Sequence, residues 1–179
     1  RIERAYVALV WGVPVPASGE ISGNIGRSPT NRKRMAVVGA GHGKPALTRY
    51  RVERVFAGKA AQVECRLATG RTHQIRVHLE SIGHPVVGDP VYAAGGWKRI
   101  GGPGRAEARR LEALAPRQAL HAALLAFRHP VSGTPLEVTS PWPADLWPLL
   151  DATAGEGAVG AREGALEAMG FFGDRTPLA

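Results

Sequence analysis

The chain has one cysteine, Cys65, among 179 residues, so an internal disulfide bond is excluded. That usage agrees with a reducing compartment, and the alternating pattern around Cys65 predicts a small buried core residue. No apolar run approaches 18 residues, which predicts a soluble protein that does not span a membrane. We expect a cytoplasmic location. The chain starts at Arg1 instead of methionine, so it is interpreted as an excerpt or a processed product.

Several motifs of common enzyme classes are missing. There is no HExxH sequence, and His73 and His78 are five residues apart instead of the four of a helical ligand pair. There is no GxSxG sequence of a serine hydrolase. The glycine-rich stretch 39–43 lacks a P-loop ending, because Lys44 is followed by Pro45. The sequence therefore predicts no metal and no cofactor.

What is present indicates one globular domain. A chain of 179 residues that is 44% hydrophobic can bury a real core. Ala and Gly dominate from residue 152 onwards, so we expect a domain over 1–151, a flexible tail over 152–179, and a monomer. Residues 12–26 predict turns around a short hairpin. The expected strands cover 6–11, 47–56, 62–69, 120–127 and 136–139, and the expected helices 72–82, 105–114 and 143–150. Residues 35–38 form a further apolar run. The fold class is α+β, with a mixed, mainly antiparallel sheet and a few helices.

Positive charge is concentrated in the first half of the chain. The net charge is +8, and residues 1–80 hold 14 Lys/Arg against 5 Asp/Glu, whereas residues 81–179 hold 9 against 10. Such asymmetry favours a polyanion-binding face, and the excess of 19 Arg over 4 Lys suits phosphate. Genomic base composition is an equally good explanation of the arginine bias. The loop 27–34 is either solvated surface or a phosphate-contacting loop, and we favour the second.

The segment 69–90 is the most informative stretch. Its apolar positions at i, i+3, i+4 and i+7 predict one buried helix face, with Thr72 at the start of the helix and Gly83 at its end. This face is formed by Ile75, His78, Leu79 and Ile82. The opposite flank offers His73, Arg76 and Glu80, with an exposed i,i+4 pair between the last two. Periodicity alone favours a surface helix with a solvated polar face.

Asp89 follows this helix as the first candidate for a catalytic carboxylate. It stands between Gly88 and Pro90, a setting typical of an aspartate that accepts hydrogen bonds from backbone amides in a turn. We therefore predict a structural role for Asp89.

The residues of this segment resemble those of a known family. The string GRTHQIRVHL at 70–79, followed by GHPVVGDPVY at 83–92, resembles the RluA-type pseudouridine synthases, which isomerise uridine in ribosomal or transfer RNA. Further segments are similar to the family in the same order, from about residue 4 to residue 151. They are 4–12, 25–27 with 34–37, 44–52, 117–122 and 129–130.

The resemblance implies an RNA-binding enzyme and assigns roles to particular residues. Arg76 matches the arginine that pairs with the catalytic aspartate, and Tyr6 matches the tyrosine that lies against the target uracil. Without the resemblance, Tyr6 would be interpreted as a core aromatic residue. Ile75 would add an apolar wall to the substrate pocket. The implied RNA contacts are Arg27, Arg32, Lys33, Arg34, Arg71, His73 and Gln74.

One departure from the family pattern concerns the nucleophile. The catalytic aspartate of the family lies in a His-Arg-Leu-Asp motif upstream of the basic-x-Tyr strand, and these 179 residues do not contain that motif. The aspartates present are Asp89, Asp145, Asp151 and Asp174, none in that context. The chain is therefore expected to be the C-terminal part of a synthase catalytic domain. The alternative is a catalytically inactive RNA-binding fragment or paralogue.

Overall fold

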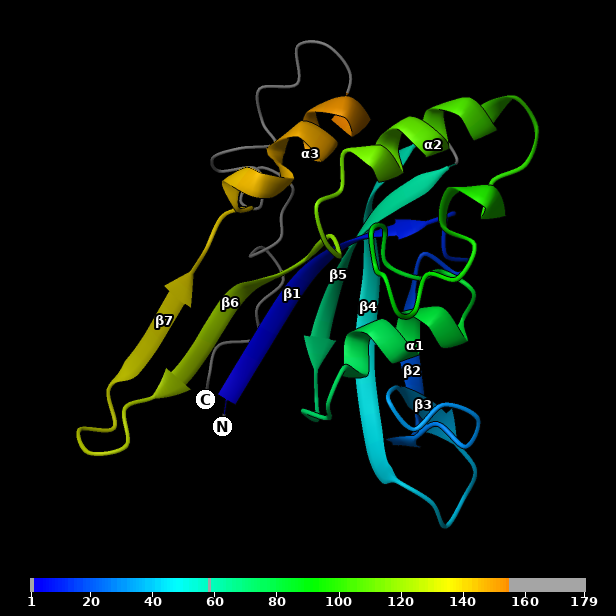
Figure 1. The fold of residues 1–179 in the computed structure, drawn as a ribbon. Helices are drawn as coiled ribbons and strands as arrows, with labels where there is room; N and C mark the ends of the chain where they lie inside the picture. Colours follow the sequence, from blue (N-terminus) through cyan, green and yellow to red (C-terminus); the bar gives the residue numbers. More distant parts are fainter. Residues whose placement is uncertain (1, 58, 155–179) are drawn as a thin grey trace.

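A single antiparallel sheet organises the molecule (Figure 1). The computed structural model describes residues 2–57 and 59–154. Within those residues seven strands lie in the order β3-β2-β4-β5-β1-β6-β7, and every pairing of neighbours is antiparallel. The strands are β1 (Ile2–Trp11), β2 (Ser18–Arg27), β3 (Met35–Val38), β4 (Lys44–Phe56), β5 (Ala60–Leu67), β6 (Leu120–Arg128) and β7 (Pro135–Thr139). The expected α+β class with a mainly antiparallel sheet is confirmed.

The strand β2 was not predicted. The sequence led us to expect turns and a short hairpin over 12–26, but Ser18–Arg27 is a ten-residue strand paired with both β3 and β4. Its apolar content is low, and only Ile21 and Ile25 are well buried among its hydrophobic residues. Pairing on both edges stabilises it in spite of its composition, because strand formation depends on cross-strand context more than on intrinsic propensity.

The first strand lies inside the sheet. β1 pairs with β5 on one edge and with β6 on the other, and its run from Val7 to Trp11 is almost completely buried. Helices α2 (Arg105–Ala113) and α3 (Trp147–Ala154) lie near each other at one end of the sheet (Figure 1). Three short 3₁₀ helices, η1 (Gly96–Arg99), η2 (Gly102–Gly104) and η3 (Ala144–Leu146), precede them. The largest core residues include Trp11, Leu9, Trp142, Leu146 and Leu149.

The register of the strands decides which side chains share a face. Tyr6 of β1 is opposite Cys65 of β5, which is opposite Tyr50 of β4, so the three side chains lie side by side on one face. Thr48, two residues from Tyr50, points to the same face and contacts His78 of helix α1 (Gln74–Ser81). Tyr6 therefore lies on the face that α1 covers. Cys65 is fully buried as predicted, and burial raises the pKa of its thiol.

Helix α1 begins and ends differently from the expectation. Thr72 does not cap it: the N-cap is His73, in the left-handed conformation with φ 57° and ψ 21°, and no side chain caps the helix. The end is as predicted, with Gly83 at φ +85°. The amides of Gly83 and His84 donate to the carbonyls of Glu80 and Leu79, which is the Schellman arrangement.

The C-terminal helix bears on the predicted domain boundary. The boundary expected between residues 151 and 152 falls within α3, which continues to Ala154. The rest of the predicted tail, 155–179, lies outside the described residues. In the part of the chain that is described, no helix has the length and apolar character needed to cross a membrane.

Candidate functional site

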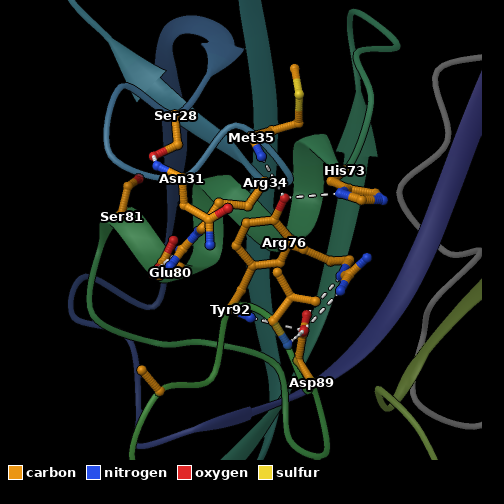
Figure 2. Close-up of polar contacts among 12 residues, drawn as sticks. Ser28, Asn31, Arg34, Met35, His73, Arg76, Glu80, Ser81, Asp89 and Tyr92 are labelled. Atoms are coloured by element: carbon orange, nitrogen blue, oxygen red, sulfur yellow. Dashed lines mark hydrogen bonds and ion pairs between the residues drawn. The ribbon is translucent and has the colours of Figure 1, made fainter.

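A buried ion pair joins helix α1 to the turn that follows it. The Nε and Nη2 atoms of Arg76 donate to the two carboxylate oxygens of Asp89 at 2.7 and 2.8 Å (Figure 2). The side chain of Asp89 is 0% exposed and that of Arg76 is 11% exposed. Its hydrogen bond to Asp89 raises the pKa of Arg76. The pair uses one edge of the guanidinium, and Nη1 takes part in neither bond.

The turn after α1 holds Asp89 in place. Its Oδ1 also accepts the amides of Val91 and Tyr92, at 2.9 and 3.0 Å, so the predicted turn-forming role is confirmed. Burial would raise the pKa of Asp89, but the hydrogen bonds from Arg76 and from these two amides outweigh it and lower the pKa. Gly88 precedes it at φ +74°, and a Cβ there would stand 2.4 Å from the carbonyl oxygen of Arg117. Only glycine fits this approach.

Tyr92 connects this turn to two other segments. Its hydroxyl accepts the amide of Met35 at 3.0 Å and contacts Nδ1 of His73 at 2.9 Å (Figure 2). The guanidinium groups of Arg34 and Arg76 lie over its ring, 4.9 and 4.7 Å from the centroid. Tyr92 is itself fully buried. It thus ties the start of β3 to the start of α1 and to the Arg76–Asp89 pair.

The basic loop 27–34 contacts Tyr92 and helix α1 through Arg34. It is folded by its own hydrogen bonds, including Ser28 N to Arg34 O at 3.0 Å and Lys33 N to Asn31 Oδ1 at 3.0 Å. Arg32 and Lys33 are exposed. Arg34 is anchored instead: its Nη2 donates to Glu80 at 2.6 Å. The predicted pair between Arg76 and Glu80 is therefore wrong, because Glu80 binds Arg34 and Arg76 binds Asp89.

The resulting surface combines exposed cations with a fixed guanidinium. Arg27, Arg32, Lys33 and His73 are exposed, and Arg71 is half-buried with its Nε donating to the carbonyl of Pro45 at 3.0 Å. Such a surface suits a polyanion, because its exposed cations surround a forked arginine. Arg76 can hold an acidic group ionised at its remaining edge.

Comparison with known proteins identifies the family. The model of the family described as RNA pseudouridylate synthase matches residues 1–81. Ribosomal large subunit pseudouridine synthase D of Zymomonas mobilis is 44% identical over 146 residues, 81% of this chain and 43% of that protein. The protein of the same name from Nitrosomonas europaea is 49% identical over 152 residues, 84% of this chain and 41% of that protein. The chain belongs to the RNA pseudouridylate synthase family.

A solved structure of a family member has the same fold. The human protein RNA Pseudouridylate Synthase Domain Containing 1 superimposes with a TM-score of 0.62 at 34% identity, over 86% of this chain and 59% of that one. The chain spans about two fifths of the length of the two curated relatives. It is therefore comparable with only part of a pseudouridine synthase.

Tyr6 and Ile75 are the two remaining residues that the resemblance assigned to the substrate pocket. Tyr6 is half-buried on the α1 face and packs against the core cluster that contains Cys65 and Ile75. Ile75 is 4% exposed and belongs to that core. Ile75 is therefore a core residue with little surface to offer a substrate, unlike the predicted pocket wall.

Gln74 occupies a different environment from the one expected of an RNA contact. It is 2% exposed, and its Nε2 donates to the carbonyl of Leu47 and to the hydroxyl of Thr48 at 2.9 and 3.0 Å. Its Oε1 accepts the hydroxyl of Thr69 and the amide of Arg71 at 2.8 and 3.0 Å. These bonds anchor the start of α1 on β4, and we remove Gln74 from the RNA contacts.

Two groups were missed by sequence reasoning. Tyr92 was part of the family-like string, but its spacing did not indicate that its hydroxyl would join His73 to Met35. Glu64 is 3% exposed on the sheet face opposite α1, where Arg51 and Arg66 bind it beside a cavity of about 330 Å³. Burial raises the pKa of Glu64. The alternation of Glu64 with Cys65 along the strand indicated that the two side chains point to opposite faces of the sheet. The burial of Glu64 depends on the neighbouring strands.

Proposed function

We propose that this chain is the C-terminal part of a synthase that converts uridine to pseudouridine in RNA, with ribosomal RNA as the first substrate to test and transfer RNA as the second. The observation that carries the proposal is the fixed guanidinium of Arg76, on the sheet face that also bears Tyr6, in a chain of this family. The names of the relatives support ribosomal RNA as the substrate class.

The chemistry demands a carboxylate that stays ionised. In pseudouridine formation the N-glycosidic bond breaks, the uracil turns, and C5 bonds to the ribose carbon. We propose that Arg76 keeps its Nε–Nη2 edge on Asp89 and meets the catalytic aspartate of an upstream His-Arg-Leu-Asp segment at the edge that carries Nη1. The bond to Asp89 fixes the guanidinium plane before substrate binds, so the second carboxylate finds an oriented partner.

The remaining residues would bind the RNA and the turning base. Tyr6 supplies a flat ring for the uracil, which must leave its stack to enter the pocket. Ile75 belongs to the core cluster against which Tyr6 packs. Arg27, Arg32 and Lys33 contact phosphates, with Arg71 and His73 at the start of α1. The partner is RNA alone in this proposal, and the protein is a cytoplasmic monomer.

The proposal is tested by restoring the missing motif. An upstream segment that carries His-Arg-Leu-Asp is fused before Arg1, and the fusion is incubated with large-subunit ribosomal RNA fragments or with transfer RNA. Mass spectrometry after chemical derivatisation is expected to detect pseudouridine, and the product is expected to vanish when the aspartate of the motif is changed to Asn. A folded fusion that binds RNA and makes no pseudouridine would favour the alternative, a catalytically inactive RNA-binding paralogue.

A further inference from the structure

His73 is held in an unusual backbone conformation at the start of α1. Its φ of 57° is in the left-handed region, which in the described residues only Ala57 shares among those other than glycine. Such a conformation costs free energy and persists where surrounding contacts fix it. Here the carbonyl of His73 accepts the amide of Val77 at 3.0 Å, and its ring packs edge-on against Tyr92 with centroids 5.6 Å apart.

The hydrogen bond to Tyr92 selects one tautomer of the ring. The Met35 amide can only donate, so the Tyr92 oxygen is an acceptor on that side. In the described part of the chain, the other partner of this buried hydroxyl is Nδ1 of His73. The phenolic proton must go there, since a buried hydroxyl proton without an acceptor is costly. Nδ1 therefore accepts, and the proton of a neutral His73 lies on Nε2.

Partial burial and the charges around His73 favour the neutral form of its ring. It is faced by Arg76 on α1, by Arg27 at the end of β2, and by Asp89 and Tyr92 in the turn. Partial burial, then Arg76, lowers the pKa of His73, and Arg27 acts in the same direction against Asp89. The residue itself is exposed. Its Nε2–H edge is thus an oriented, uncharged donor among cations.

We propose that His73 binds RNA as a neutral donor, giving its Nε2–H to an acceptor oxygen of the nucleic acid, and that Tyr92 is the positioning residue that fixes this tautomer. The inference rests on the proposed function, since it names one contact of the same RNA-binding face. The acceptor is a phosphate oxygen or a base carbonyl, which share the chemistry of an unprotonated oxygen. A neutral donor adds a directed contact without displacing a counterion from the RNA.

Nuclear magnetic resonance tests the tautomer without RNA. The chain carries two internal references: Nδ1 of His129 accepts the amides of Val131 and Ser132, whereas Nδ1 of His84 donates to the carbonyl of Trp11. At about pH 8.5, two units above an ordinary histidine pKa, the ¹⁵N shifts of His73 should match the Nε2–H form of His129. A match to His84 would overturn the proposal.

The variant Tyr92→Phe tests the role of the hydroxyl. Loss of the bond to Nδ1 should let His73 exchange between tautomers and should raise its pKa, because that bond stabilises the neutral ring. The shifts of His84 and His129 should stay unchanged. Unaltered His73 shifts in a folded variant would remove Tyr92 from this role. If the variant does not fold, the comparison within the parent chain still decides the tautomer.

RNA binding tests the donor. The variant His73→Asn should fold, because asparagine tolerates the left-handed conformation. It removes the donor, because its short amide does not reach the position of Nε2. The affinity for oligouridine should fall about 3- to 10-fold, the range of one lost hydrogen bond, with an unchanged slope of log affinity against log salt. The affinity is also measured for an abasic ribose-phosphate oligomer. If His73→Asn lowers that affinity as well, the acceptor is a phosphate oxygen. If the variant and the parent bind the abasic oligomer equally, the acceptor is a base carbonyl.

Two outcomes contradict this contact. An unchanged affinity in His73→Asn overturns the donor role, and a reduced salt slope overturns its neutrality, since that would mark a cation on phosphate. If the parent chain binds no RNA, the donor role fails together with RNA binding. The tautomer measurement needs no RNA, so it tests the Nε2–H form of His73 separately from RNA binding.

Discussion

The Arg76–Asp89 pair shows how one buried contact combines structure with chemistry. Asp89 is fully buried and takes four hydrogen bonds, two from Arg76 and two from the amides of Val91 and Tyr92. Removing one partner from a buried pair leaves an uncompensated charge, which costs about 3–5 kcal/mol. The arginine is therefore required for stability as well as for the proposed catalysis.

Acidification should expose the contribution of Asp89. Its pKa in the folded chain lies below the unfolded value of about 3.9, so its contribution is fully present above that pH. The contribution is lost as pH falls towards the folded pKa, because the unfolded state takes up its proton first. Urea unfolding from pH 3 to pH 7 should show Asp89→Asn about 3 kcal/mol less stable than the parent at neutral pH. This difference in the free energy of unfolding should become smaller below about pH 4. A difference that does not change with pH would contradict the contribution assigned to the Asp89 carboxylate.

The two roles of Arg76 can be separated with a double variant. Arg76→Met should lower the melting temperature by leaving Asp89 charged and unpaired, and Arg76→Met with Asp89→Asn should recover part of that loss. In the fusion that carries the upstream motif, both variants should make no pseudouridine. Arg76→Lys should rescue poorly, because an ammonium cannot form the two-pronged grip. Turnover by the folded double variant at the parent rate would remove Arg76 from catalysis.

Sequence reasoning predicted the parts of this site better than their pairing. The Gly-Asp-Pro context was enough to predict that Asp89 accepts backbone amides. The partner of Arg76 could not be predicted from helix spacing, which favoured Glu80 at i+4. The turn brings Asp89 back from 13 residues along the chain, and Glu80 is taken by Arg34 from 46 residues away. Long-range contacts of this kind depend on the fold.

At the scale of elements, the strands with strong alternation were predicted and β2 was not. β4 and β5 were predicted to within three residues at each end, whereas the residues of β3 were described only as an apolar run. β2 is polar and glycine-rich, and its stability comes from neighbours that are distant in sequence. The position of Gln74 also depends on residues that are distant in sequence. Its polar side chain predicted an exposed RNA contact, but it forms hydrogen bonds to β4.

The loop between β2 and β3 should account for part of the salt dependence of RNA binding. Arg32 and Lys33 are exposed, so Arg32→Ala with Lys33→Ala should reduce the slope of log affinity against log salt by about 1.4 on single-stranded RNA, or about 0.7 for each phosphate released. Arg34→Ala should change the slope less, because Arg34 is bound to Glu80.

A matched pair of arginines controls for the loss of net charge. Arg109→Ala with Arg110→Ala removes two exposed cations from α2, which lies far from β3 in Figure 1. That variant should keep the parent slope. Equal slopes in the loop variant and the parent would exclude the loop from the RNA contacts.

At the scale of the whole molecule, these 179 residues should bind RNA without modifying it. In the part of the chain that the structure describes, Arg76 binds the carboxylate of Asp89, which already accepts four hydrogen bonds. Glu64 lies on the opposite face of the sheet. Loss of a catalytic nucleophile commonly costs many orders of magnitude in rate. Incubation of the unfused chain with uridine-containing RNA should therefore give no pseudouridine by mass spectrometry. Robust product would make Asp89 the first residue to mutate.

The position of β1 inside the sheet has a consequence for biosynthesis. Tyr6 pairs with Cys65 on one side and Ala122 on the other, so β1 leaves the ribosome well before either of its two neighbours in the sheet. Until then its apolar run, Val7 to Trp11, has both hydrogen-bonding edges open, which is the state most prone to aggregation. Folding of this sheet is governed by closure of long loops and is therefore slow for its size. The nascent chain is accordingly a natural client for chaperones that shield exposed apolar strands.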